Sequence, residues 1–367
     1  MAKETKKLRS GFTTGANCAA GTKAALMAII SGECPTTVEI PFPGGKRHSF
    51  TLTDCILDKA NQTATTSLIK DAGDDPDVTH LAEIRVTVSL KHNPDITPPR
   101  CLYLDHIQLC TGKGVGHATK PGLACKPGEP AINPGPRQMI KMAVKEIPEV
   151  SGKDICVTLS IPKGEELAKE TLNGRLGIVG GLSILGTTGI VRPLSAAAWR
   201  ATVAASLKMA KESGLREVVV STGRTSEKAA RQYLNLPEAA CIEMGDFLKF
   251  TLKAAGHFKF DAVHYSGMWA KVTKAALRVP QTHVRNGALE MVQAAALLEE
   301  LGAEGELLHT LQGSNTAREM FYHLTDAGRD DIIKAVCKRA KSYCEELSGL
   351  PVPFYLVAPD GNILVKV

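Results

Sequence analysis

The second half of the chain alternates strand-like and helix-like segments, and this alternation restricts the possible folds more than any other feature of the sequence. Short apolar runs are separated by longer segments of helical character. Strand, helix and strand at this spacing indicate a parallel sheet with helices on its faces. The expected elements are 195–213, 217–221, 226–233, 240–244, 247–255, 262–265, 270–277, 287–301, 317–324 and 330–347, followed by a hairpin around 360–362. We therefore expect a Rossmann-like α/β domain with a parallel sheet over residues 193–367.

The first half has a different pattern, in which strands dominate and one helix comes early. Residues 15–30 are rich in alanine and carry little charge, which favours a helix. Apolar and polar residues alternate from Ile84 to Leu90, which is the period of a half-buried strand. The runs 38–41 and 48–53 flank a Pro-Gly-Gly turn and predict a hairpin. We expect an α+β domain with a mixed sheet over residues 1–192.

Glycine and proline are dense between residues 111 and 136. A segment of this composition is expected to trace a fixed irregular path and to contain no regular element. Long irregular loops inside compact domains are usually functional. This segment is therefore a candidate part of a binding site.

Composition and charge narrow the class of protein. The chain has 367 residues, of which 44% are hydrophobic and 22% charged, as in a globular enzyme. The net charge of +6 comes without aromatic residues between the basic ones, so a small anionic ligand is expected and a nucleic acid is not. No apolar run approaches the ~20 residues of a membrane-spanning helix, and the N-terminus lacks the apolar core of a secretory signal. We expect a cytoplasmic protein with no membrane partner, and a homodimer is left open.

The ten cysteines are scattered along the chain and form no C-x-x-C pair. This distribution favours reduced, buried thiols in a cytoplasmic protein over disulfides or a metal centre. No metal site in the protein is expected.

Residues 175–191, with the sequence RLGIVGGLSILGTTGIV, form the strongest candidate for a cofactor loop. Glycines let the backbone approach a ligand, and threonine hydroxyls add hydrogen-bonding groups. Neither G-x-G-x-x-G nor the Walker sequence is present, so neither a dinucleotide nor a triphosphate site is indicated. The alternative is that the glycines serve only tight turns between strands. The expected cofactor-binding residues here are Gly177, Gly180, Gly181, Gly186, Thr187 and Thr188.

Two turns in the second half follow predicted strands. Ligands of open α/β sheets lie beyond the carboxyl ends of the strands, where an acidic residue commonly binds ribose hydroxyls. Ser221 and Gly223 come at the end of one strand, and Asp246 follows the next strand, with Glu243 near the end of that strand. These four residues are predicted to bind a cofactor, although Asp246 could equally cap the helix that follows it.

Two further groups could take part in catalysis. Asp74 and Asp77 lie in an acidic turn over residues 71–79, where carboxylates could bind a metal, act as acid and base, or only solvate the turn. His283 precedes a predicted helix and could be a base or a ligand contact, while a lone histidine could also be structural. Asp74, Asp77 and His283 are our candidate catalytic residues.

Four blocks of sequence occur in a specific order. They are GFTTGANCAAGTKAAL at 11–26, KDAGDDPDVT at 70–79, GKGVGHATKPGLACKPGEPAINPGPRQMI at 112–140 and LNGRLGIVGGLSILGTTGIVRPLS at 172–195. Together they resemble the CbiD family of cobalamin biosynthesis. The resemblance runs from about residue 9 to beyond residue 300, and it is strongest before residue 195.

The resemblance implies a reaction and a set of ligands. It implies that S-adenosylmethionine donates a methyl group to ring carbon C1 of cobalt-precorrin-5B, giving cobalt-precorrin-6A. Cobalt would then arrive inside the substrate. Together with Asp74 and Asp77, the residues expected to face the ring are Thr13, Thr14, Lys120, Glu129, Asn133 and Arg137. Gly267, in the block SGMWAK, is expected to join the cofactor-binding residues.

Two other functions are compatible with the sequence. A nicotinamide or flavin oxidoreductase fits the β/α alternation, although the missing G-x-G-x-x-G counts against it. A non-catalytic corrinoid-binding protein of the same pathway is the second alternative. Cofactor extraction would separate the first from a methyltransferase, and turnover with a labelled methyl donor would separate the second.

Overall fold

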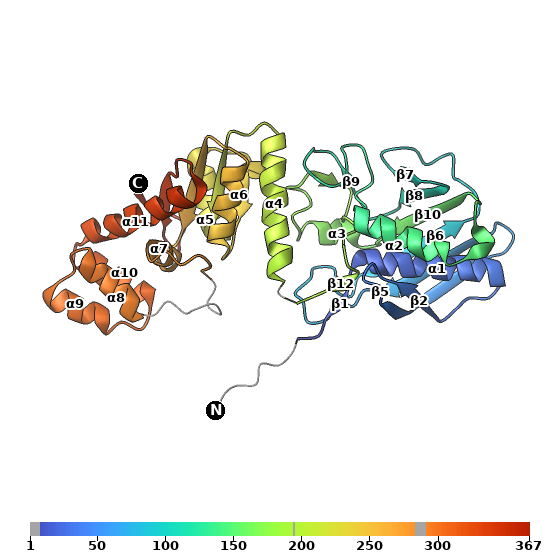
Figure 1. Cartoon of the computed structure of the whole chain (residues 1–367), viewed down its shortest axis with the longest axis horizontal. Coiled ribbons are helices and arrows are strands. Elements are labelled where there is room, and N and C mark those ends of the chain that lie inside the picture. Colours follow the sequence, from blue (N-terminus) through green and yellow to red (C-terminus); the bar gives the residue numbers. More distant parts are fainter. Residues whose placement is uncertain (1–7, 194, 283–290) are drawn as a thin grey trace, which may run out of the picture. The chain divides into compact units, whose positions relative to one another are not determined.

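The structure is a computed structural model that describes residues 8–193, 195–282 and 291–367. The chain divides into two compact units, Met1–Ser195 and Ala196–Val367 (Figure 1). Both units mix helices and strands, which confirms the expected α/β class.

The first unit is built on a six-stranded mixed sheet. Neighbouring strands are antiparallel except for β8 and β10, which run parallel. The strands in spatial order are β4 (Asp54–Asp58), β5 (Thr63–Ile69), β6 (Glu83–Ser89), β10 (Ile155–Ser160), β8 (Ile107–Thr111) and β7 (Cys101–Leu104). The predicted alternation is confirmed in β6, where Ile84, Val86 and Val88 are buried.

Two helices pack side by side against this sheet (Figure 1). Helix α1 (Thr14–Ser31) lies across β5 and β6, and α2 (Pro134–Lys145) packs along α1. Small residues let α1 approach the sheet closely, because a Cβ atom on Gly21 would lie only 2.7 Å from Val86 Cγ2. The alanine-rich segment 15–30 was correctly predicted as this helix.

Shorter elements complete the first unit. The predicted hairpin is confirmed as β2 (Thr37–Pro41) and β3 (Arg47–Thr51). Strand β1 (Gly11–Phe12) pairs with β12 (Ile190–Val191), and β9 (His117–Ala118) pairs with β11 (Ile178–Val179). The remaining pieces are η1 (Pro148–Val150) and α3 (Gly164–Ala168).

The prediction that residues 111–136 contain no regular element is wrong at the C-terminal end of that segment. Pro134 and Pro136 stand in the first turn of α2. Proline is tolerated there because the first N–H groups of a helix have no partner inside the helix. The rest of the segment is irregular apart from the two-residue strand β9.

The second unit has a five-stranded sheet in the order β14 (Cys241–Glu243), β13 (Glu217–Ser221), β15 (Ala262–Gly267), β16 (Phe354–Val357) and β17 (Ile363–Lys366). The first four strands are parallel, as predicted, and β17 is antiparallel to β16. Numbered along the unit, this is the order 2-1-3-4-5, which belongs to the flavodoxin-like type of doubly wound sheet and not to the dinucleotide-binding type. The chain reverses its direction of winding between β13 and β15.

Eight helices of the second unit lie within the described residues. They are α4 (Ala196–Glu212), α5 (Arg224–Leu234), α6 (Leu248–His257), α7 (Trp269–Ala276), α8 (Met291–Glu300), α9 (Gly305–Gln312), α10 (Ala317–Asp326) and α11 (Asp330–Ser348), with one 3₁₀ turn, η2 (Glu238–Ala240). All but α9 and η2 were expected from the sequence. Of the segment predicted as a helix over 287–301, only the part from Met291 is described.

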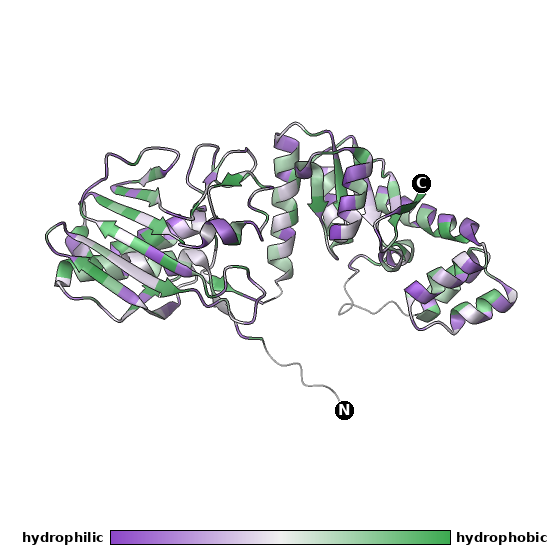
Figure 2. Ribbon diagram, turned by 180° about the vertical axis from the view of Figure 1, so that it is seen from behind, coloured by the Kyte–Doolittle hydropathy of each residue, from purple (hydrophilic) through white to green (hydrophobic). Residues whose placement is uncertain are grey.

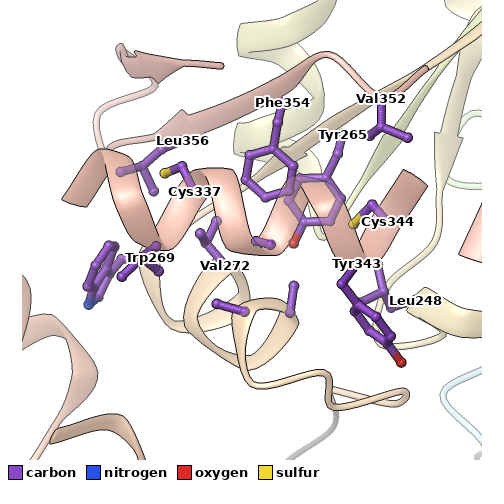
Figure 3. Packing of buried hydrophobic residues seen from close by; sticks show 14 of the residues in the cluster. Leu248, Tyr265, Trp269, Val272, Cys337, Tyr343, Cys344, Val352, Phe354 and Leu356 are labelled. Carbon is purple, nitrogen blue, oxygen red and sulfur yellow. The ribbon is translucent and has the colours of Figure 1, made fainter. Parts of the chain in front are cut away.

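Part of the core of the second unit lies between its sheet and helices α7 and α11 (Figure 3), and the same cluster includes residues of α4, α6, α8 and α10. The rings of Tyr265 and Phe354, from neighbouring strands, stack with centroids 4.2 Å apart. Cys337 and Cys344 of α11 fill the adjacent space as buried thiols, and burial raises the pKa of Cys337 to about 12. Apolar residues are concentrated on the strands in the middle of each unit (Figure 2).

Candidate functional site

The N-terminus of α1 is fastened to the glycine-rich segment. Thr13 is the N-cap of α1, and its Oγ1 accepts a hydrogen bond from the N–H of Ala16 at 3.2 Å. The Thr13 N–H donates to the carbonyl oxygen of Gly189 at 3.0 Å. The buried Thr14 hydroxyl bonds both backbone groups of Leu185. Thr14 therefore holds the segment in place, whereas the half-buried Thr13 lies at the surface of the same junction.

The N-terminus of α2 meets the same segment. A Cβ atom on Gly15 would lie 2.6 Å from Pro136 Cγ, and one on Gly135 would lie 2.5 Å from the carbonyl oxygen of Gly186. The two helix N-termini and residues 185–187 are thus in direct contact. Neither helix has an acidic residue in its first turn. Because helix N-termini carry a partial positive charge, this corner attracts anions.

The glycines between residues 177 and 186 have two different roles. Gly177 and Gly181 are buried, and a Cβ atom on Gly181 would lie 2.3 Å from the carbonyl carbon of Gly114. These two glycines therefore permit close packing of the chain on itself. Gly180 is exposed, and a Cβ atom there would have no neighbour nearer than 3.9 Å. Thr187 and Thr188 are also exposed, so these three residues can meet a ligand.

Lys120 lies against the glycine-rich segment. Its side chain occupies the space beside Gly177, where a Cβ atom would lie 2.5 Å from Lys120 Cγ. The preceding residue fixes this contact, because the Thr119 hydroxyl donates to the carbonyl oxygen of Gly177 at 2.7 Å. A lysine is thereby held beside Gly177 of the glycine-rich segment.

Glu129, Asn133 and Arg137 form a connected group at the start of α2. The Arg137 guanidinium donates to Glu129 Oε2 at 2.7 Å and to the carbonyl oxygen of Ile132 at 2.6 Å. Burial raises the pKa of Glu129, but the hydrogen bond and charge of Arg137 outweigh it, so the net pKa lies below its usual value. Asn133 is the N-cap residue, and its Oδ1 accepts a bond from the Cys125 thiol at 3.3 Å. Arg137 is therefore largely neutralised by Glu129 in the free protein.

Both candidate catalytic aspartates have partners in the chain. Asp77 forms an ion pair with Lys70, with 2.6 Å between Oδ2 and Nζ, and Lys70 is only 1% exposed. Burial raises the pKa of Asp77, but the charge of Lys70 and the hydrogen bonds from Lys70 and Thr79 lower it by more. The net pKa of Asp77 therefore lies below its usual value, and the carboxylate is held ionised. Asp74 accepts a bond from the backbone N–H of Arg9 at 2.7 Å. These contacts explain both residues structurally, and their catalytic role stays a prediction.

Backbone hydrogen bonds bring the four sequence blocks together in the first unit. The first block meets the second through the N–H of Phe12 and the carbonyl oxygen of Asp71 at 2.7 Å, and it meets the fourth through Gly15 and Leu185 at 2.9 Å. The fourth block meets the third through the N–H of Ile184 and the carbonyl oxygen of Ala131 at 2.8 Å. Segments far apart in the chain thus form one surface around the start of α1.

One shallow hollow in the first unit lies elsewhere. It is lined by Met27, Ile30, Ser31, Glu33, Cys34, Pro35, Ile147 and Glu149. These residues surround the C-terminal end of α1, about 25 Å from its N-terminus at 1.5 Å per residue. The hollow is therefore separate from the corner where the four blocks meet.

In the second unit, the predicted residues lie at the carboxyl ends of three neighbouring parallel strands. Ser221 ends β13 and is buried, and its hydroxyl has no hydrogen-bond partner within the described residues. Gly223 starts the turn into α5, and a Cβ atom there would meet nothing within 4 Å. Glu243 ends β14 and is half-buried. Gly267 ends β15 and is closed off, because a Cβ atom there would lie 2.8 Å from the Tyr265 hydroxyl. Gly223 and Glu243 therefore border open space, and Gly267 serves packing.

Asp246 is held by its own neighbours. Lys271 of α7 forms an ion pair with its carboxylate, and the Thr282 hydroxyl donates to the same oxygen at 2.8 Å. The alternative interpretation of Asp246 as the cap of the following helix is wrong, because Phe247 occupies the N-cap position of α6. Asp246 links the loop after β14 to Thr282 just past α7.

His283 lies outside the described residues. The sequence also gave no reason to select Trp199 or Lys271. Trp199 is half-exposed and its indole N–H donates to the carbonyl oxygen of Met244 at 3.2 Å. The two partners are 45 residues apart in the chain, so no local pattern could have revealed the contact.

Fold and geometry define a two-unit α/β protein. Its first unit has an anion-attracting corner at paired helix N-termini, and its second has a doubly wound sheet with an open carboxyl edge. Comparison with protein families gives a more specific result. The model of the family described as CbiD matches residues 1–193, and that of the CbiD C-terminal domain matches residues 281–367. The chain belongs to the CbiD family.

Several relatives are similar over nearly their whole length. A protein of Desulfotalea psychrophila is 55% identical over 99% of this chain and 99% of its own. A protein of Geobacillus thermodenitrificans is 46% identical over 99% and 96%, and one of Thermus thermophilus is 41% identical over 94% and 90%. All three are named cobalt-precorrin-5B C(1)-methyltransferase. A crystal structure of a cobalamin biosynthesis protein (cbiD) from Archaeoglobus fulgidus is 26% identical, with a TM-score of 0.38, and covers 72% of this chain and 79% of that chain.

The described ranges contain neither a membrane-spanning helix nor a cluster of metal ligands. None of the helices there has both the length and the apolar composition that a membrane crossing requires. In the same ranges no three His, Cys, Asp or Glu residues are grouped so that they could hold a metal ion.

Proposed function

We propose that this protein methylates ring carbon C1 of cobalt-precorrin-5B, with S-adenosylmethionine as the methyl donor, to give cobalt-precorrin-6A. The observation that carries the proposal is the 55% identity to a relative with this activity in its name, over 99% of both chains. Cobalt belongs to the substrate, so the protein itself needs no metal ligands.

The first unit is the proposed site for the anionic macrocycle. Its paired helix N-termini lack acidic residues in their first turns, and Lys120 is held against Gly177 of the glycine-rich segment that contacts them. A ring that carries several carboxylates gains energy from such a corner. Most of the first N–H groups of α1 are already bonded to Thr13 and Leu185, so α1 acts mainly through its dipole. A direct hydrogen bond to the ring would come from the exposed hydroxyl of Thr187, whereas the Thr188 hydroxyl is bonded to both backbone groups of Ile190.

The carboxyl edge of the second sheet is the proposed site for the methyl donor. The winding reverses between β13 and β15, which is where ligands of this fold type bind. Open space at Gly223 lets the backbone approach a ligand, and Glu243 at the next strand end suits the two hydroxyls of a ribose. The carboxylate of Asp246 is already bound to Lys271, which favours Glu243 for this role. That Gly180, Thr187 and Thr188 also contact the donor stays a prediction.

The methyl transfer depends more on the alignment of the two ligands than on reactive side chains of the protein. When bound, the donor supplies an electrophilic methyl group on a sulfonium, and the electron-rich ring carbon attacks it in line. In such a step the carbon–sulfur bond breaks as the carbon–carbon bond forms, the thioether S-adenosylhomocysteine leaves, and the positive charge passes from the sulfur to the ring. The protein therefore contributes by orienting both ligands and by excluding water. Asp77, ionised beside Lys70, neutralises a buried cation of the protein and is a poor proton acceptor. No nucleophilic residue of the chain is required.

Turnover of the purified protein tests the proposal. The protein is incubated without oxygen with cobalt-precorrin-5B and S-adenosylmethionine labelled on the methyl group, and the corrinoid product is analysed by mass spectrometry and NMR. The proposal requires one labelled methyl group on C1. Binding of the corrinoid without transfer would indicate the non-catalytic alternative, and a flavin or nicotinamide extracted from the protein would indicate an oxidoreductase.

We further propose a cytoplasmic location. All ten cysteines are free in the structure, and eight are buried or nearly so, which fits a reducing compartment. A homodimer stays a prediction that sedimentation of the purified protein would test.

A further inference from the structure

Trp199 has an unusual position at the carboxyl edge of the second sheet. It lies in the first turn of α4 and is 41% exposed. The chain has only one other tryptophan, Trp269, which is 6% exposed and packs in the core of the unit (Figure 3). A large aromatic ring left partly in water beside a ligand-binding edge is available for contact with a ligand.

The loop after β14 fixes the orientation of this ring. The indole N–H donates to the carbonyl oxygen of Met244, and the ring lies over Gly245, where a Cβ atom would come within 3.0 Å of Trp199 Cζ2. Gly245 has a φ of +54°, a conformation that glycine adopts without strain. Phe247 stacks on one side, with ring centroids 6.4 Å apart and an interplanar angle of 27°. The indole of α4 is thus held against this loop before any ligand arrives.

Glu243, the proposed ribose-binding residue, lies next to the backbone group that holds this ring. It ends β14 immediately before Met244, whose carbonyl oxygen accepts the indole bond, so the carboxylate belongs to the residue next to the one that holds the ring. The N–H of Met244 in turn donates to the carbonyl oxygen of Ser221 at 2.9 Å, which ties this turn to the end of β13. A nucleoside whose ribose met Glu243 would bring its base close to the indole.

We propose that Trp199 is the stacking platform for the adenine ring of the methyl donor. This inference rests on the proposed function of the second unit. Flat nucleobases stack on aromatic side chains whatever hydrogen bonds their edges make, and a preorganised ring loses little conformational entropy when it is covered. Trp199 is therefore a binding residue that fixes the donor, and it takes no part in the methyl transfer itself.

Two substitutions of the same residue separate stacking from packing. Trp199→Phe keeps an aromatic face, and Trp199→Leu keeps an apolar side chain that can still pack α4 onto the loop. The dissociation constant of S-adenosylmethionine, measured by calorimetry, should change by less than about threefold for Phe and rise roughly tenfold or more for Leu. At saturating donor, kcat should be unchanged in both, with the loss confined to KM. Thermal unfolding of the two variants is the control, because a purely structural role predicts equal affinities at equal stability.

Tryptophan emission gives a second readout that does not depend on turnover. In the wild-type protein, the donor should quench the emission saturably, and Trp199→Phe, which leaves only Trp269, should remove the quenching. Unchanged affinity in Trp199→Leu, or quenching that persists in Trp199→Phe, would overturn the platform while the proposed function stands. A wild-type protein that does not bind S-adenosylmethionine would overturn both the stacking platform and the proposed function.

Discussion

The ion pair between Lys70 and Asp77 allows the catalytic and structural interpretations of Asp77 to be separated. In Asp77→Asn, the amide can still accept from Thr79, but the ammonium of Lys70 loses its counter-charge at a position where it is 1% exposed. Removing one partner of a fully buried pair costs about 3–5 kcal/mol. Because Asp77 itself is 24% exposed, water can partly solvate the remaining charge, and we expect a loss of about 2–3 kcal/mol.

Urea unfolding measures this loss. Both tryptophans lie in the second unit, so their emission reports that unit, and hydrogen exchange of peptides from β5 and β6 reports the first. With an m-value of about 2–3 kcal/mol/M, the first-unit transition should move by about 1 M. Adding Lys70→Met to Asp77→Asn removes the unpaired charge and should restore more than half of the loss. Asp74→Asn, at an exposed position, should change stability by less than about 1 kcal/mol.

Stability and turnover together decide the role of Asp77. The structural account predicts that Asp77→Asn loses stability while kcat of the folded fraction falls less than about tenfold. A variant with wild-type stability and a kcat reduced by more than about a hundredfold would refute the reasoning and favour Asp77 as an acid or base. The lowered pKa of Asp77 gives the sign of the pH dependence. Its contribution is complete above the unfolded value of about 3.9 and is lost as the pH falls through the lower folded value.

Three further predictions follow from the same geometry. Gly181→Ala should prevent folding of the first unit, whereas Gly180→Ala should cost about 1 kcal/mol because its φ is +85°, and equal melting temperatures would contradict this. The pKa of Glu129 lies below its usual value, so its stabilisation is present above about pH 4.3 and is lost as the pH falls through the folded value. Glu129→Gln should therefore lower stability by about 1 kcal/mol at neutral pH and converge with wild type in acid, and parallel acid-unfolding curves would count against the pair. Glu243→Gln should weaken S-adenosylmethionine binding about tenfold, measured by calorimetry, and leave the melting temperature unchanged. Asp246→Asn should instead lower the melting temperature. A stable Asp246→Asn that binds the donor weakly, together with a Glu243→Gln that binds it normally, would show that the two roles are exchanged.

Local patterns were sufficient to predict most elements of the second unit and, in the first unit, α1, the β2–β3 hairpin and β6. The alternation in β6 and the strand–helix spacing of the second half each have a period that sequence displays directly. Helix α2 was not predicted at all, and Pro134 and Pro136 in its first turn resemble loop residues unless their position in a helix is known. The strand order 2-1-3-4-5 depends on which strands pair at long range, and spacing along the chain does not determine this.

The candidate site was predictable as a set of segments but not residue by residue. The four blocks meet in space, yet the sequence could not show that Gly181 closes against Gly114 while its neighbour Gly180 is open. Both glycines have positive φ, and only the tertiary structure around them differs. In the same way, the sequence showed acidic residues without their partners, so the buried Lys70 beside Asp77 was not foreseen.

Hydrogen exchange with each ligand in turn tests the central claim most directly, namely that different units hold the methyl donor and the macrocycle. The measurement uses the full chain, with S-adenosylmethionine alone and then with cobalt-precorrin-5B alone. The account predicts that the donor protects peptides covering 221–225 and 241–247, and that the macrocycle protects those covering 11–17, 133–138 and 185–189. Donor protection confined to 175–191, with the strand ends of the second unit unchanged, would contradict it.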